Sequence, residues 1–221
     1  MGYLLQNPTI VGSLLVQHLT MTVIALAIAI SVAIPLTLLI HSLQWLKLGV
    51  MGILSVLYTI PSLALMILLI PIFGLSAKSV IAAMVIYAQV ILVRNLLTGL
   101  QSLDPAVLEA ATGMGMNPWQ RWWHVQVPLI LPIFLGGLRI ASIVAIAMAS
   151  IGAKFGAGGL GTLLFDGIAQ VGRYDKIWAG AIALAGLALT VNALLILLEQ
   201  WVTPHRRLTQ PIQVRSTPYS S

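Results

Sequence analysis

The sequence has no cysteine, and charged residues make up only 7% of its 221 positions. The lack of cysteine excludes disulfide bonds, thiol chemistry and thiolate metal sites. Soluble domains carry about 25% charged residues, whereas 59% of this chain is hydrophobic and its mean hydropathy is +1.02. We therefore predict a membrane protein built as one compact domain.

Acidic residues are the scarcest charged group, with five Asp and Glu against eleven Lys and Arg and a net charge of +6. The basic residues are dispersed over short loops and the C-terminal end. This distribution is typical of loops that orient a membrane protein and argues against a nucleic-acid partner. No Asp or Glu lies in the middle of an apolar run. Proton- and sodium-driven transporters usually need such groups, so the sequence indicates an energy source outside this chain.

Long apolar runs dominate what is present. A helix needs about 20 apolar residues to cross the hydrocarbon core, and five runs are long enough. We predict an all-α polytopic membrane protein with five transmembrane helices, at residues 19–40, 48–75, 79–100, 127–151 and 177–198. Residues 1–18 form an N-terminal segment, 19–202 the transmembrane domain and 203–221 a polar tail. The first basic residue is Lys47, so we expect no cleaved signal peptide.

Five spans place the two termini on opposite sides of the membrane, and positive residues mark the inner side. One side would hold Lys47, Arg121, Arg206, Arg207 and Arg215. The other would hold Lys78, Lys154, Arg173 and Lys176, partly offset by Asp166 and Asp175. We therefore expect segment 1–18 outside, and the loop 101–126 and the tail in the cytoplasm.

The loop 101–126 has no long apolar run and contains several helix-capping and helix-breaking residues. Asp104-Pro105 and Asn117-Pro118 each place a favoured N-cap before a proline, which is tolerated at the first helical position. The sequence thus predicts two short helices at 105–112 and 118–126, separated by a sharp break at Gly113 and Gly115.

Each of these short helices carries a group of residues suited to contact with another protein or with the membrane surface. On the first, Ala110 and Ala111 beside Glu109 would let another surface approach the backbone closely. On the second, the aromatic residues follow a helical spacing of i, i+3 and i+4, at Trp119, Trp122 and Trp123. Two interpretations of the tryptophans stand: an interfacial belt at the headgroup level, or contact with a protein. For the whole helix–glycine–helix unit we favour a docking element.

The same residues carry a family resemblance. Glu109, Ala110 and Ala111, then Gly115, then Val125, Val127 and Pro128 have the spacing of the "EAA" motif of ABC-importer permeases. Valines stand where the family usually has isoleucine and leucine. In that family the motif forms a coupling helix seated on a cytoplasmic ATPase. The resemblance implies a type I ABC-importer permease in the bacterial cytoplasmic membrane, with Glu109, Ala110, Ala111, Gly115 and Pro128 in coupling and no cofactor of its own, since ATP and Mg would bind the ATPase.

Three further stretches, 58–75, 137–141 and 156–161, resemble permeases of the osmoprotectant group, which import glycine betaine, carnitine and choline. The resemblance implies alternating access with three partners: an ABC ATPase dimer, a second permease copy or related permease, and an extracytoplasmic binding protein. Three alternatives stay open. The chain could be a permease for methionine or another amino acid, a channel or secondary transporter independent of ATP, or a structural subunit without solute flux.

Three other patterns do not predict a functional site. Residues 156–161 satisfy G-x-G-x-x-G but follow a membrane span rather than a strand, which favours an outer turn or re-entrant element over a nucleotide site. Residues 167–174 approach a phosphate loop, with Arg173 and Tyr174 where Lys and Ser or Thr are required. The four histidines lie in separate loops or at span edges and no pair has metal-binding spacing, so we expect no metal site; they are His18, His41, His124 and His205.

Ionisable and polar residues within the spans are the remaining candidates. Arg94 can extend toward the cytoplasmic face, and Arg139 must do the same or pair, with Glu199 as a candidate partner. Four polar or helix-breaking residues of spans two and three could line a pathway or serve helix packing: Tyr58, Pro61, Tyr87 and Gln89. Because the spans hold few aromatics, we expect the binding protein to select the substrate.

Overall fold

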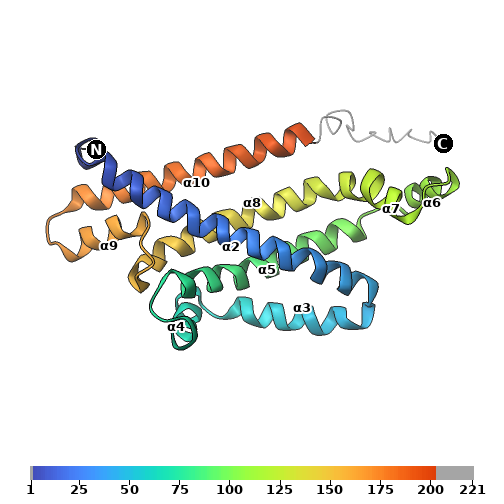
Figure 1. Cartoon of the computed structure of the whole chain (residues 1–221), viewed down its shortest axis with the longest axis horizontal. Helices are drawn as coiled ribbons and strands as arrows, with labels where there is room; N and C mark the ends of the chain where they lie inside the picture. The colour runs from blue at the N-terminus through green and yellow to red at the C-terminus, as the bar shows by residue number, and fades with distance from the viewer. Residues whose placement is uncertain (1, 203–221) are drawn as a thin grey trace, which may run out of the picture.

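The computed structural model describes residues 2–202, and that part of the chain is helical with short connections (Figure 1). The elements are α1 (Gly2–Gln6), α2 (Pro8–Ser42), α3 (Gln44–Thr59), α4 (Ser62–Phe73), α5 (Ala77–Gln101), α6 (Pro105–Gly113), α7 (Pro118–Arg121), the π-helical turn η1 (Trp122–Gln126), α8 (Val127–Gly152), the 3₁₀ turn η2 (Ala153–Phe155), α9 (Gly161–Ala169) and α10 (Tyr174–Val202). The predicted tail, 203–221, lies outside the described residues.

Four helical segments are long and apolar enough to cross a membrane: Pro8–Ser42, Ala77–Gln101, Pro118–Phe155 and Tyr174–Val202. The pair α3 and α4 makes a fifth if it counts as one bent span. The all-α membrane fold is therefore confirmed, with the predicted number of spans reached only through this bent pair.

The span predicted as one helix at 48–75 is wrong, because the chain turns by 101° between α3 and α4. Pro61 is the cause. It has no N–H to continue the helical ladder, and it forces the residue before it out of the α region. Ile60 accordingly has an extended backbone, with φ −66° and ψ 125°. The side chain of Tyr87 donates a hydrogen bond to the freed Ile60 carbonyl.

Helix α2 begins at Pro8, well before the predicted span start at residue 19. Much of the predicted N-terminal segment is thus the first turns of this helix. His18, predicted to lie at a span edge, is instead inside α2 and has no exposed surface. That prediction is corrected by the structure.

Helix α5 lies at the centre, packed mainly against α8 and α2. On α2, Ala25, Ala29 and Ala33 recur every four residues and are almost completely buried, which lets the helices approach closely. On α8 the close contacts are at glycine: a Cβ on Gly137 would lie 2.7 Å from Asn95, and one on Gly152 would lie 2.5 Å from Val80. Small residues therefore set the spacing of the central helices.

The two ends of the bundle differ. Figure 1 shows α6, α7 and the turn between α2 and α3 at one end, and α1, α4 and α9 at the other. Lys47 and Arg121 fall at the first end, whereas Lys78, Lys154, Arg173 and Lys176 fall at the second. This sorting agrees with the predicted one. The tail arginines used in the same prediction lie outside the described residues.

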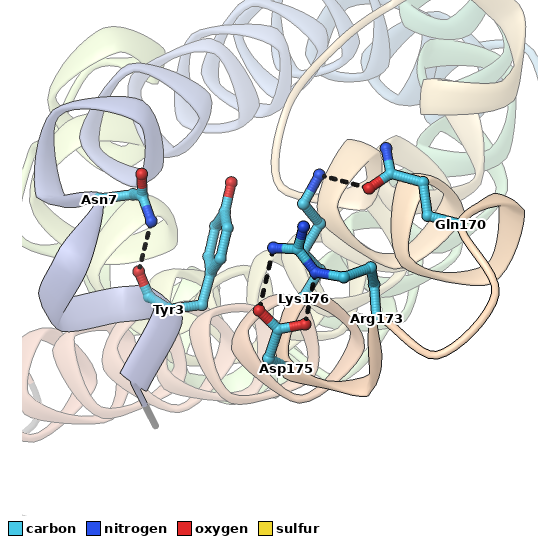
Figure 2. A network of polar contacts seen from close by, with 6 residues as sticks. All are labelled: Tyr3, Asn7, Gln170, Arg173, Asp175 and Lys176. Carbon is cyan, nitrogen blue, oxygen red and sulfur yellow. Dashed lines mark hydrogen bonds and ion pairs between the residues drawn. The ribbon is translucent and has the colours of Figure 1, made fainter.

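At the second end a polar network holds α1 against the start of α10 (Figure 2). Arg173 donates two hydrogen bonds to the Asp175 carboxylate, at 2.9 and 3.1 Å. This ion pair raises the pKa of Arg173. The Tyr3 ring lies 5.9 Å from the Arg173 guanidinium and 5.7 Å from the Lys176 ammonium, distances at which cation–π attraction acts.

Candidate functional site

The predicted docking segment folds as two short helices that leave the bundle end (Figure 1). Helix α6 starts as predicted, because the Asp104 carboxylate accepts a hydrogen bond from the Ala106 N–H at 2.9 Å. Pro105 follows at a position where an N–H would have no helical partner. An exposed segment of nine residues therefore carries its own start signal.

The end of α6 is a Schellman turn. The Met116 N–H donates to the Ala111 carbonyl at 3.2 Å, and the Gly115 N–H donates to the Thr112 carbonyl at 2.9 Å. Gly115 has φ +80°, a conformation that costs any other L-residue energy. Gly113, predicted to share the break, is the last residue of α6, so the sharp turn depends on Gly115 alone.

Helix α7 is shorter than predicted. Asn117 and Gln120 form a reciprocal capping box, each side chain accepting from the other's main-chain N–H at 2.9 Å. The helix is then interrupted by the π turn η1, in which the Val127 N–H bonds back to the Trp122 carbonyl. Pro128 lies in the first turn of α8, where proline is tolerated.

The three tryptophans run from α7 into the π turn. Trp119 and Trp123 pack edge to face, with ring centroids 5.6 Å apart, and remain largely exposed. Trp122 is half-buried, and with Trp123 it lines an apolar cavity of about 380 Å³ between α2, α5 and α8. Trp123 thus contacts Trp119 and shares the cavity lining with Trp122, and the three rings differ mainly in exposure.

The motif residues divide by exposure. Glu109, Ala110 and Gly115 are exposed, whereas Ala111 is buried. The Arg121 guanidinium donates a hydrogen bond to the Thr112 hydroxyl at 2.9 Å, which fixes α7 beside α6. A shallow hollow lies between them, lined by Leu108, Glu109, Thr112, Gly113 and Arg121. Glu109 and the small residues beside it are thus exposed on a unit of two short helices.

Of the four pathway candidates, the structure brings three together. Tyr58 and Tyr87 have ring centroids 5.3 Å apart, next to the break at Pro61. Gln89 lies elsewhere, and its amide donates to the Ala29 carbonyl of α2 at 2.9 Å. Arg94 extends to the Ser55 hydroxyl at 3.5 Å.

Sequence reasoning missed one polar cluster, in the N-terminal third of α2. The His18 Nε2 lies 3.1 Å from the Ile146 carbonyl, and Gln17 accepts a hydrogen bond from the Gly159 N–H at 3.1 Å. These contacts join α2 to α8 and to the glycine-rich turn at 156–161. Two adjacent polar residues before a long apolar run were the available signal.

Residues 25–208 match the family of binding-protein-dependent transport system inner membrane components. The chain belongs to this family. It is therefore an integral membrane permease subunit of an ABC importer.

Curated relatives cover nearly the whole permease. An osmoprotectant import permease of Salmonella typhimurium is 39% identical over 207 residues, spanning 91% of this chain and 96% of the relative. A carnitine transport permease of Listeria monocytogenes is 36% identical over 85% and 86% of the two chains. A choline transport permease of Bacillus subtilis is 33% identical over 94% and 92%.

Solved structures agree on the fold. The permease superposes on a chain of the methionine ABC transporter in an inward-facing conformation with a TM-score of 0.78 and 21% identity, covering 88% of this chain and 96% of that one. A chain of an amino acid ABC transporter solved with histidines gives a TM-score of 0.74 at 20% identity, covering 90% and 97%. The type I importer fold predicted from the motif is therefore confirmed.

Proposed function

We propose that this permease imports quaternary ammonium osmoprotectants, such as glycine betaine, carnitine and choline. The observation that carries the proposal is the similarity, at 33% to 39% identity over most of the chain, to permeases named for osmoprotectant, carnitine and choline transport. The amino acid importers share only 20% to 21% identity, which supports a common fold without a common substrate.

The energy comes from a partner in this proposal. Glu109, Ala110 and Gly115 are exposed on the two short helices at the end of the bundle, as residues that contact another protein must be. A cytoplasmic ABC ATPase dimer binds this unit and carries ATP and Mg. Closure of the ATPase subunits moves α6, and the helices of two permeases rock to open the opposite side.

The remaining partners follow from the same scheme. A second permease, either a copy or a related chain, completes the pathway in the bacterial cytoplasmic membrane. A binding protein on the outer side captures substrate and delivers it at the end where α1, α4 and α9 lie. The loop 101–126 faces the cytoplasm, and the N-terminus faces outward.

A substrate test comes first. The gene is deleted, and uptake of labelled glycine betaine and of labelled methionine is followed after a salt upshift. We expect betaine uptake to fall while methionine uptake is unchanged. If only methionine uptake is lost, the proposed substrate class is wrong, and the chain remains assigned as an importer permease.

A coupling test separates docking from folding. Glu109→Lys reverses an exposed charge, so the protein should insert and fold normally while transport and substrate-stimulated ATPase activity are lost. Gln101→Lys adds positive charge at the same end, at another exposed position, and should retain transport. Normal uptake by Glu109→Lys would overturn the assignment of α6 as the coupling helix.

A further inference from the structure

The break between α3 and α4 places two aromatic rings against each other within the membrane part of the fold. Tyr58 is in the last turn of α3, and Tyr87 is in the middle of α5. Their ring centroids are 5.3 Å apart, with the planes inclined by 48°. The rings are inclined rather than stacked in parallel, so they form a corner at the α3–α4 break.

One ring is fixed and the other is accessible. Tyr87 is 8% exposed, packs in the buried cluster that includes Met84 and Leu65, and donates its hydroxyl proton to the Ile60 carbonyl. Tyr58 is 43% exposed. The buried Tyr87 ring therefore fixes the position of the pair. Tyr58 is the ring that a substrate moving along α3 can contact.

The main chain adds negative potential at the same point. Helix α3 ends at Thr59, and the last carbonyls of a helix carry its negative partial charge. Pro61 has no N–H, so it cannot donate to the Leu57 carbonyl as a continuing helix would. Broken helices in transporters use such carbonyl ends to hold cations.

This corner suits one class of cation. No Asp or Glu occurs in α3, α4 or α5, so a metal ion or an ammonium group would find no carboxylate there. A quaternary ammonium group has no N–H to donate, and aromatic faces attract it through the ring quadrupole. The exposed Tyr58 ring beside the C-terminus of α3 supplies that attraction.

We propose that the corner formed by Tyr58 and Tyr87 at the α3–α4 break is a transit site for the quaternary ammonium head group of the substrate. The inference rests on the proposed function and assigns to this chain a share of the selectivity otherwise given to the binding protein.

Arg94 gives the site a group that can bind the carboxylate of a zwitterionic substrate. Its guanidinium lies 3.5 Å from the Ser55 hydroxyl, and Ser55 precedes Tyr58 by three residues, about 4.5 Å of helical rise. A positive group therefore stands about one turn from the rings. A substrate with both an ammonium and a carboxylate places the carboxylate toward Arg94, whereas choline has no group for it.

The test uses the complete complex, with ATPase and binding protein, in proteoliposomes loaded with ATP. Tyr58→Leu removes the exposed ring, Tyr58→Phe keeps it, and Trp45→Leu removes another exposed ring of α3 as a matched control. We expect Tyr58→Leu to lower the maximal rate of betaine uptake about tenfold, as expected for loss of a desolvated cation–π contact. KM should stay unchanged because the binding protein sets capture, and Tyr58→Phe and Trp45→Leu should match the wild type.

The outcomes are separable. If the wild-type complex transports betaine and Tyr58→Leu transports it at the same rate, the transit site is overturned and the proposed function remains. Equal loss in Tyr58→Leu and Tyr58→Phe also overturns it, because the ring would then not be the active element. A wild-type complex that moves no quaternary ammonium compound overturns the proposed function and the transit site together.

The orientation is tested by the ratio of betaine to choline uptake. Arg94→Gln should lower this ratio about threefold to tenfold, by loss of a charge-assisted hydrogen bond. Ser55→Ala, which removes the recorded partner of Arg94 but keeps its charge, should preserve the ratio. An unchanged ratio in Arg94→Gln would remove Arg94 from the site, and an equal fall for both substrates would make its role structural.

Discussion

The Arg139 guanidinium of α8 lies 3.6 Å from the Glu199 carboxylate of α10. The sequence left two possibilities for Arg139, extension to the membrane surface or pairing with a candidate partner such as Glu199, and the structure shows the pair. It joins the bundle to a helix that contributes only Ala179 and Gly180 to the buried residues, both near its start. The contact therefore restrains the opposite end of α10.

Removing either charge should loosen α10. About one third of each side chain is exposed, so we expect a coupling free energy of only about 0.5–1 kcal/mol. It is measured with Arg139→Leu, Glu199→Leu and the double variant in a double-mutant cycle of unfolding in detergent. Strict additivity of the two single changes would show that the ion pair contributes nothing.

Adjacent glycines of α8 give a second prediction. A Cβ on Gly137 would lie 2.7 Å from the Asn95 side chain, whereas one on Gly136 would meet nothing within 4 Å. Gly137→Ala should therefore destabilise the bundle by about 1–3 kcal/mol through overpacking. Gly136→Ala should be neutral or slightly stabilising, because alanine favours a helix. Thermal unfolding in detergent compares the two, and equal midpoints would contradict the close α5–α8 approach.

Much of this fold follows from hydrophobic length alone, because each span must satisfy its own backbone hydrogen bonds in lipid. Local chemistry also predicted the starts of the two short helices, since Asp104 and Asn117 cap α6 and α7 as their proline neighbours indicated. The sequence shows Pro61 but does not show that the helix ends there. Two other prolines, Pro35 and Pro71, lie inside helices that continue past them. Tertiary contacts decide which proline ends a helix.

The candidate site shows the same limit. The helical spacing of Trp119, Trp122 and Trp123 predicted one stripe, but it did not predict that Trp122 and Trp123 line a cavity together with residues of α2, α5 and α8. The pairing of Tyr58 with Tyr87 joins residues 29 positions apart in different helices, and no local pattern encodes it.

The turn after α6 yields a third prediction. Neither Gly113 nor Gly115 has an atom within 4 Å of an added Cβ, yet only Gly115 has a positive φ of +80°. Gly115→Val should therefore strain the backbone by about 1–2 kcal/mol without a clash and misplace α7 relative to α6. We expect normal insertion with reduced substrate-stimulated ATPase activity, while Gly113→Ala retains both. Full coupling in Gly115→Val would mean that the geometry of the turn is not needed.

The buried cluster at the start of α2 yields the last prediction. His18 has no exposed surface, and its Nε2 lies 3.1 Å from the Ile146 carbonyl of α8. His18→Leu removes this contact. The Ser150 hydroxyl still donates to the same carbonyl at 3.0 Å, so the loss should destabilise the protein by about 0.5–1.5 kcal/mol, as for one hydrogen bond. His18→Gln, which can still donate from a similar position, should recover part of the loss. His41→Leu, at the exposed end of the same helix, is the matched control and should unfold at the wild-type temperature. If His18→Leu is as stable as His41→Leu, then α2 is held to α8 by its alanine face alone, and the polar cluster is dispensable for folding.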